Sequence, residues 1–206
     1  RVGAGSDALL VNAIDGDTSG SLRLRQYATA GDAGRTEKNV APGVGARGGD
    51  ARSELVVTKH AAKLEVVLEA QAGDSSGRDA LGAAISGGVA TTSADLRNES
   101  GAIDAVYRSI GGIGAGLTIQ DLRNGTGGAA SAVLRATTTG DGQRITIRPN
   151  RDDRGSNFGA TGGEGGSADR FSPTAHDVGG DGGTGSTTVE GIALGNSEVD
   201  VEAVAA

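Results

Sequence analysis

Apolar and polar residues alternate strictly in four segments that begin at residues 21, 63, 102 and 143. In the first, "SLRLRQYATAGDAG", Leu22 and Leu24 alternate with Arg23 and Arg25. A period of two places successive side chains on opposite faces of a β-strand. We therefore predict four strands, each with one buried aliphatic face and one solvated, charged face. Charges on neighbouring strands could pair if the strands are adjacent.

A second strand pattern precedes each of these segments, as in "SELVVTKHAA" and "TTSADLRNESG". The short connections "DGDTSG", "NESG" and "TGDG" carry the Gly, Asp and Asn residues that tight turns favour, so hairpins are the simplest interpretation. The remaining glycine-rich stretches, such as "GDAGRTEKNVAPGVGARGGD", predict either mobile loops or extended strands packed closely against a neighbour.

This organisation predicts an all-β fold. We expect an elongated tandem β-strand repeat, built as a β-solenoid or as stacked hairpins forming a sandwich, with glycine-rich extended segments. The whole chain, residues 1–206, would form one repeat domain. Its expected units span about residues 7–49, 50–88, 89–128, 129–166 and 167–206.

The composition indicates a thin core. Glycine contributes 38 residues, while there are only two Phe and two Tyr and no Trp, Met or Cys. The lack of cysteine removes disulfides and thiolate metal sites, and it fits an exported bacterial protein. A chain without methionine has no initiator residue, so we expect a processed product or an excised portion of a longer polypeptide.

The charge of the chain bears on its partners. The formal net charge of −7 argues against nucleic acid, because phosphate binding requires a basic surface. No apolar run is long enough to predict a membrane-spanning helix. We therefore expect neither nucleic acid nor a membrane span.

The segment "EVDVEAVAA" near residue 206 places Val199, Val201 and Ala203 on one face and Asp200 and Glu202 on the other. Such a strand either closes the protein's own sheet or adds to the sheet edge of another subunit. Self-closure is the simpler of the two interpretations. Val199, Val201 and Ala203 are the candidate assembly residues.

A turn at "DGDTSG" offers a candidate calcium site through Asp15, Asp17 and Ser19, which have the spacing that opens an EF-hand loop. The twelfth position is Gln26, which cannot supply the bidentate carboxylate, so an EF-hand is excluded. A looser calcium site in this turn is one alternative and a plain polar turn is the other. We expect no other cofactor.

Two further features of the sequence bear on modification and catalysis. Asn98 in "NES" and Asn124 in "NGT" match the acceptor for N-linked glycosylation and fall in predicted turns. The two histidines, His60 and His176, lie far apart in the sequence, and no nucleophile motif accompanies them. We therefore predict surface histidines and no enzymatic activity.

Units such as "SLRLRQYATAGDAG…GARGGDARSELVV" and "GTGGAASAVLRATTTGDG" lead from a GG-x-A sequence into a strand. In this the chain resembles the glycine-rich tandem β-strand repeat proteins of bacterial surfaces, including PEP-CTERM-sorted and autotransporter-like polypeptides. The resemblance covers residues 7–166, and charged residues interrupt many of its GG-x-GG runs. It implies an exported structural or adhesive protein and no catalytic residues.

Two functions follow as expectations. The first is a non-catalytic extracellular structural protein, a subunit or segment of a filament, matrix or surface layer that assembles with itself through β-strand contacts. The alternative is an adhesin-like module at the cell surface that binds a glycan or another surface ligand, either with calcium or without it. A polysaccharide-active enzyme would need carboxylates clustered on one face, and the adjacent Asp152 and Asp153 point apart in a strand.

Overall fold

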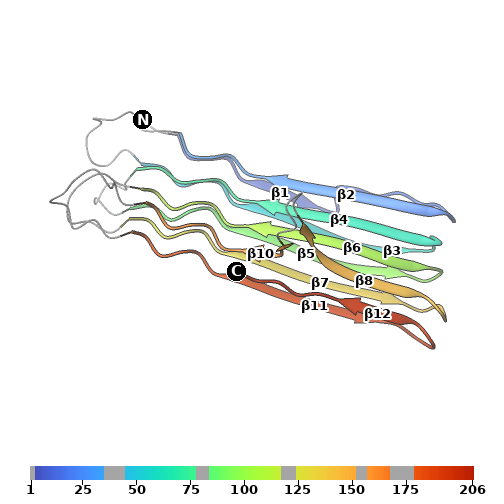
Figure 1. Ribbon diagram of the computed structural model, residues 1–206. Coiled ribbons are helices and arrows are strands. Elements are labelled where there is room, and N and C mark those ends of the chain that lie inside the picture. The colour runs from blue at the N-terminus through green and yellow to red at the C-terminus, as the bar shows by residue number, and fades with distance from the viewer. Residues whose placement is uncertain (1–2, 35–44, 78–83, 117–123, 152–156, 168–178) are drawn as a thin grey trace.

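A computed structural model of the protein describes residues 3–34, 45–77, 84–116, 124–151, 157–167 and 179–206. These residues form two facing β-sheets and contain no helix (Figure 1). The strands are β1 (Ala8–Val11), β2 (Ser21–Thr29), β3 (Ala51–Lys59), β4 (Lys63–Gln71), β5 (Ala90–Asn98), β6 (Ala102–Ile110), β7 (Ala130–Thr138), β8 (Arg144–Arg151), β9 (Asn157–Phe158), β10 (Ala160–Thr161), β11 (Gly185–Ile192) and β12 (Glu198–Val201).

Strands β1 to β8 alternate between the two sheets, as do β11 and β12, while the short β9 and β10 pair with β8 and β6. Sheet A has the order β1-β3-β5-β7-β11, and sheet B has the order β12-β8-β6-β4-β2. All pairs along these two orders are parallel and in register, so that Ser21 lies beside Lys63 and Lys63 beside Ala102. The molecule is therefore a stack that runs from β1 and β2 at one end to β11 and β12 at the other (Figure 1).

This topology corrects the predicted fold class and the description of the chain as an all-β repeat protein. The hairpin interpretation paired each strand with its sequence neighbour, whereas β1 to β6 each pair in parallel with the strand two places along, and β7 and β8 pair onward with β11 and β12. Turns such as "NESG" between β5 and β6 carry the chain from one sheet to the other and form no hairpin. The architecture is two parallel sheets of alternating strands, a pairing more typical of α/β proteins than of antiparallel all-β folds.

The space between the two sheets is filled mainly by aliphatic side chains. The largest fully buried residues include Leu55, Leu64, Leu68, Leu96 and Tyr107. They come from the inward positions of both sheets, as the alternation in the sequence predicted. We call the part of the molecule formed by strands β1 to β12 the strand half. Burial of these side chains supplies its hydrophobic stabilisation.

The core becomes thinner along the strands. Near one end of β2, β3, β4 and β5 the inward residues are alanines, and Ala28, Ala51, Ala70 and Ala90 form a separate small cluster. Beyond them the chain continues into glycine-rich segments. The decrease from leucine to alanine to glycine lets the two layers approach each other in this direction.

We call the glycine-rich part the glycine half, and it comprises residues 3–7, 30–34, 45–50, 72–77, 84–89, 111–116, 124–129, 162–167 and 179–184. Here the layers are joined directly by backbone hydrogen bonds. Gly112 N–H donates to Gly88 O at 2.9 Å, and Gly128 N–H donates to Gly112 O at 2.8 Å. The same link continues from Gly31 to Gly183, so each chain segment bonds to the one before it in the opposite layer.

Successive N–H groups in these segments point in three directions. Gly111 donates to Thr161 O in the same layer, Gly112 to Gly88 O in the facing layer, and Ile113 outward to the Asp74 carboxylate. Gly114 and Ala115 then repeat the same-layer and facing-layer directions. A repeat of three residues without internal hydrogen bonds is the geometry of a polyproline II helix.

Glycine is required here by close approach of the backbones. A Cβ atom on Gly112 would lie 1.9 Å from Gly73 O, which is far inside van der Waals contact. Gly112 does not have a positive φ, since among the described residues the glycines with positive φ are Gly77, Gly142 and Gly195. The missing side chain, and not an unusual backbone angle, therefore explains these glycines.

Candidate functional site

Strand β8 leaves sheet B before its neighbours do. It pairs with β6 as far as Pro149, opposite Tyr107. Proline has no N–H to donate, so the ladder is interrupted there. Asn150 and Arg151 then pair antiparallel with β9, and β10 resumes the place beside β6. The excursion leaves a groove on the outer face of sheet B.

Tyr107 bridges the gap that β8 leaves beneath this groove. Its side chain is fully buried, and its hydroxyl donates to Glu202 O at 3.0 Å and accepts from Val204 N–H at 3.2 Å. The tyrosine thus takes the place of a neighbouring strand for the backbone that follows β12. Burial raises the pKa of the Tyr107 hydroxyl above its ordinary value, so the group stays neutral at physiological pH.

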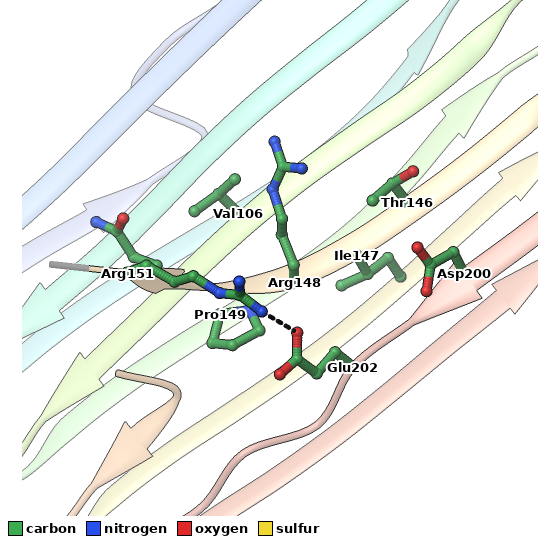
Figure 2. A pocket seen from close by; sticks show the side chains of 9 residues that line it. Val106, Thr146, Ile147, Arg148, Pro149, Arg151, Asp200 and Glu202 are labelled. Atoms are coloured by element: carbon green, nitrogen blue, oxygen red, sulfur yellow. Dashed lines mark hydrogen bonds and ion pairs between the residues drawn. The ribbon is translucent and has the colours of Figure 1, made fainter. Parts of the chain in front are cut away.

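The groove has a volume of about 430 Å³ and is formed mainly by β8 and β12 (Figure 2). It is lined by Val106, Thr146, Ile147, Arg148, Pro149, Asn150, Arg151, Asp200 and Glu202. Figure 2 shows the Arg151 guanidinium pointing to the Glu202 carboxylate, at 3.3 Å. The lining therefore combines hydrogen-bond donors and acceptors with a few apolar surfaces.

A second hollow of about 250 Å³ shares Val106 and Arg148 with this groove. It extends across β6, β4 and β2 to Arg23. We call the two together the outer trough. It crosses the strands of sheet B, because the register aligns Val67 of β4 with Val106 of β6 and Arg148 of β8.

Ion pairs join neighbouring strands along the outer trough. Arg148 lies 3.3 Å from Asp104, and Arg23 lies 3.6 Å from Glu65. A hydrogen bond from Lys63 is the main cause that lowers the pKa of Glu65, so this carboxylate is ionised at neutral pH. Partly exposed pairs of this kind contribute little to stability, and their groups stay accessible to solvent.

The two ends of the stack carry different side chains. At one end, β12 directs Val199 and Val201 inward over Gly191 of β11, and both valines remain about 40% exposed (42% and 41%). The third residue predicted for assembly, Ala203, follows β12 and is exposed. The strand pairs with β8 of its own chain and leaves its other edge uncovered by the described residues.

The opposite end is formed by β1 and β2. Leu9 and Val11 of β1 are 65% and 46% exposed. On the outer face of β2, Arg23 and Arg25 are both exposed. Extension of the sheet B register past β12 would place a second β2 with Arg23 beside Asp200 and Arg25 beside Glu202.

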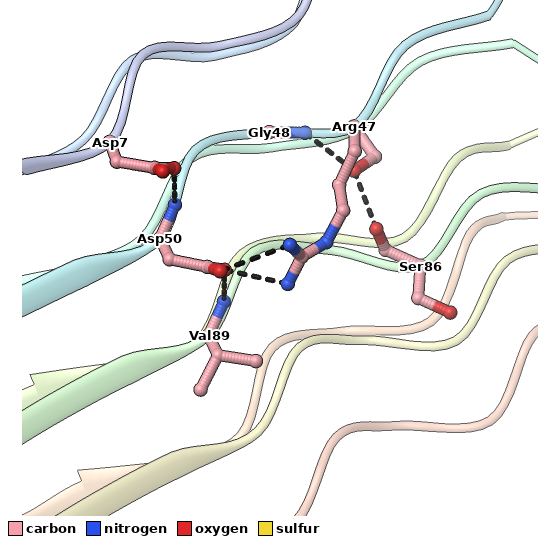
Figure 3. Close-up of polar contacts among 7 residues, drawn as sticks. Asp7, Arg47, Gly48, Asp50, Ser86 and Val89 are labelled. Atoms are coloured by element: carbon pink, nitrogen blue, oxygen red, sulfur yellow. Dashed lines mark hydrogen bonds and ion pairs between the residues drawn. The ribbon is translucent and has the colours of Figure 1, made fainter.

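Aspartates on the outside of the glycine half form a ladder. Asp50 N–H donates to Asp7 Oδ1 at 2.8 Å, and Val89 N–H donates to Asp50 Oδ1 at 2.7 Å (Figure 3). Sheet B has the equivalent ladder through Asp32 and Asp74. Each carboxylate satisfies the outward N–H of the next chain segment in its layer. These aspartates therefore have a structural role, which accounts for the Gly-Asp pairs at residues 31–32, 49–50 and 73–74.

The candidate calcium residues lie in the connection between β1 and β2. The Asp15 carboxylate accepts hydrogen bonds from Lys59 Nζ at 2.5 Å and from Gly16 N–H at 2.8 Å. The bond from Lys59 is the main cause that lowers the pKa of Asp15. Asp17 and Ser19 follow in the same connection, while the Asp15 carboxylate is engaged by Lys59 of β3. Among the described residues, no group of three acidic, His or Cys side chains could hold a metal ion.

Both asparagines of the glycosylation motifs are buried. Asn98 is the last residue of β5 and is fully buried, and its side-chain amide donates to Ala61 O and Ala102 O. Asn124 is 4% exposed and belongs to the glycine half. A sugar on either side-chain nitrogen would have no space in the folded protein.

The two histidines occupy separate parts of the chain. His60 is exposed, with Nδ1 3.5 Å from a carboxylate oxygen of Glu99. His176 lies outside the described residues, as do Asp152 and Asp153. In the part of the chain that the structure describes, no helix is long and apolar enough to cross a membrane.

The residues of the outer trough were missed by sequence reasoning. Arg148 and Thr146 lie in the segment that begins at residue 143, and Tyr107 lies in the one that begins at residue 102. The alternation in these segments predicted only strands. The available signal was Pro149, because a proline within a central strand indicates a departure from the sheet. Its consequence for Tyr107 and Glu202 depends on contacts distant in sequence.

No known protein family, curated protein or solved structure matches this chain. Its resemblance to glycine-rich proteins of bacterial surfaces therefore stays a prediction. The interpretation of function rests on the geometry of the sheet ends and of the outer trough.

Proposed function

We propose that this chain is a non-catalytic structural subunit of an extracellular filament, matrix or surface layer, and that copies join head to tail. In this proposal the β11 and β12 end of one copy docks on the β1 and β2 end of the next. Each sheet then continues in parallel from one copy into another. Self-assembly is the activity, and the subunit holds no substrate.

The observation that carries the proposal is the match between the two ends of sheet B. With the observed register continued, Asp200 and Glu202 would face Arg23 and Arg25 of the next copy. The inward residue Val199 would meet Leu22 on the core side. Charges complementary in sign and position favour one register over its alternatives, and burial of the valines supplies the hydrophobic contribution.

Exposed parallel edges support the same conclusion. An uncovered strand presents unpaired N–H and C=O groups to any chain able to pair with it. The acidic net charge keeps separate copies soluble. The absence of cysteine is consistent with an extracellular setting in which no disulfide is needed.

A charge-exchange experiment tests the proposed joint, which is the contact between β12 of one copy and β2 of the next. One variant carries Asp200→Lys and Glu202→Lys, and the other carries Arg23→Glu and Arg25→Glu. Alone, each variant places like charges at its own joint and should remain monomeric in sedimentation velocity and electron microscopy. An equimolar mixture restores opposite charges at every joint, so it should assemble as the wild type does.

The control is Asp95→Lys, which changes a charge on β5 in the middle of sheet A. This variant should assemble normally. Thermal melting of all variants checks that the subunits remain folded. A wild type that stays monomeric at high concentration would refute the proposal, and so would charge variants that assemble separately as well as they do together.

A further inference from the structure

We propose that the outer trough is a binding site for a neutral polysaccharide whose chain lies across the strands of sheet B. The site belongs to a single subunit, so the inference goes beyond self-assembly and does not depend on it. The observations that carry it are the shape, the apolar floor, the paired polar walls and the charge of the trough.

The floor of the outer trough is apolar. Val67 and Val106 lie in one row across β4 and β6, and the register continues this row on β8 at Arg148, beside the buried Pro149. Sugar rings present faces of C–H groups, which pack against aliphatic surfaces of this kind. A floor of small side chains between longer ones also leaves room for a ring to settle.

The walls combine donors with acceptors at short range. Arg148 with Asp104 and Arg151 with Glu202 each place a guanidinium beside a carboxylate at 3.3 Å. A sugar hydroxyl is both a donor and an acceptor, so a pair of adjacent hydroxyls can bond to both members of such an ion pair. Thr146 adds a further hydroxyl to the groove wall.

The charge of the trough selects a neutral ligand. Three guanidinium groups face four carboxylates, from Arg23, Arg148, Arg151, Glu65, Asp104, Asp200 and Glu202. Without a positive excess the surface does not favour a nucleic acid or an acidic polysaccharide. A peptide strand would dock at a sheet edge through its backbone, whereas the trough lies on a sheet face.

The dimensions fit a chain of several sugars. The trough extends over β2, β4, β6, β8 and β12, and neighbouring parallel strands lie about 4.8 Å apart. This spacing is close to the length of one sugar residue in an extended polysaccharide. Each residue of the ligand would therefore meet a new strand, and the strand register would align successive contacts.

Affinity electrophoresis in native gels tests the site with defined probes. The neutral probes are hydroxyethyl cellulose, xyloglucan, laminarin and dextran, and the acidic probes are polygalacturonate and heparin. We expect at least one neutral probe to retard the protein, with little dependence on salt. Isothermal titration with oligosaccharides of the retarding polymer then measures the affinity.

Arg148→Gln and Arg151→Gln remove trough contacts and should each weaken binding about tenfold, as expected when a charge-assisted hydrogen bond is lost. Arg135→Gln is the matched control, because Arg135 is similarly exposed and pairs with Glu190 at 3.2 Å on the outside of sheet A. This control should bind as the wild type does. All three substitutions lie on the surface and should leave the melting temperature nearly unchanged.

The inference is overturned if no neutral probe retards the protein, if only acidic probes do so, or if Arg135→Gln weakens binding as much as the trough variants. Binding and assembly are both measured on the wild type, because Arg23, Asp200 and Glu202 line the trough and the charge variants would change it. A wild type that assembles without binding refutes the trough alone. A wild type that binds but stays monomeric at high concentration refutes head-to-tail assembly alone.

Discussion

The strand half and the glycine half are built from the same chain segments in the same order, yet they hold their two layers together in different ways. In the strand half the sheets are separated by side chains, with Leu68 and Tyr107 among those fully buried. In the glycine half the positions between the layers are mostly glycine, with small residues such as the buried Ala115, and the backbones bond directly, as from Gly128 to Gly112. One half is stabilised mainly by hydrophobic burial, and the other by hydrogen bonds and close backbone packing.

The comparison shows that residue size sets the distance between layers. Facing sheets normally lie about 10 Å apart because side chains fill the gap. Replacement of leucine by alanine and then by glycine along one strand closes this gap without a change of register. A single chain segment can therefore take part in a sheet at one end and in a polyproline II bundle at the other.

The largest expected effect comes from a methyl group placed between the layers of the glycine half. In Gly112→Ala the added Cβ would lie 1.9 Å from Gly73 O, so the layers must separate and the Gly112 bond to Gly88 O must weaken. We expect a loss of about 3 kcal/mol in the free energy of unfolding, at the upper end for overpacking. Urea denaturation of the wild type and of Gly112→Ala measures this difference in unfolding free energy.

The matched control is Gly182→Ala in the same half. Its Cβ would have Gly163 O as its nearest described neighbour, at 3.8 Å, which is an ordinary contact. We expect a change within about 0.5 kcal/mol. If both substitutions cost the same, the close-packing account of the glycine half is wrong.

An intermediate effect is expected at Tyr107 in the strand half. Its side-chain hydroxyl makes hydrogen bonds to backbone groups, whereas in the glycine half backbone groups bond to one another. Tyr107→Phe keeps the ring but leaves Glu202 O and Val204 N–H without this partner. We expect a loss of about 1–2 kcal/mol in unfolding free energy. If the unfolding free energy does not change, the hydroxyl is not needed to hold the backbone that follows β12 in place.

The same residue gives a pH dependence. Burial raises the pKa of folded Tyr107 above its ordinary 10.0, while the unfolded tyrosine ionises near that value. The folded state then holds a proton that the unfolded state has lost, so stability falls as pH rises above about 10. The fall should be smaller in Tyr107→Phe when both proteins are melted between pH 8 and pH 11.

The smallest effect is expected on the outside of the glycine half. Asp74→Ala removes the acceptor for Ile113 N–H, which can bond to water instead, so we expect a cost of about 1 kcal/mol or less. Asp74→Asn retains a carbonyl acceptor and should cost less than the alanine variant. Hydrogen exchange at Ile113 tests whether Asp74 is the acceptor for this amide, since the amide should exchange faster only in Asp74→Ala.

Strand positions were predicted well because alternation is a local property. The segments beginning at Ser21, Lys63 and Ala102 became β2, β4 and β6 with these first residues. The choice of partner was wrong, because a turn such as "NESG" serves equally well in a hairpin or between two sheets. Only the tertiary pairing of equivalent strands distinguishes these outcomes.

The candidate sites depended on contacts that no local pattern contains. The acidic turn at Asp15 suggested a metal ligand, but Lys59 of β3 reaches it from the next chain segment. Asn98 lies in a sequence typical of a turn, yet the strand continues through it into the core. For the outer trough, Pro149 was visible in the sequence as a sign that β8 departs from the sheet. The strands distant in sequence that line the trough could not be predicted from it.

The direct backbone contact in the glycine half has a thermodynamic consequence. Exposure of apolar surface raises the heat capacity on unfolding, whereas exposure of polar surface lowers it. The glycine half buries peptide groups and little hydrocarbon, so it adds less to this change than the usual ~12–15 cal/mol/K per residue. A smaller heat-capacity change flattens the curve of stability against temperature. The glycine half, which has few side chains in its interior, should therefore weaken least on cooling.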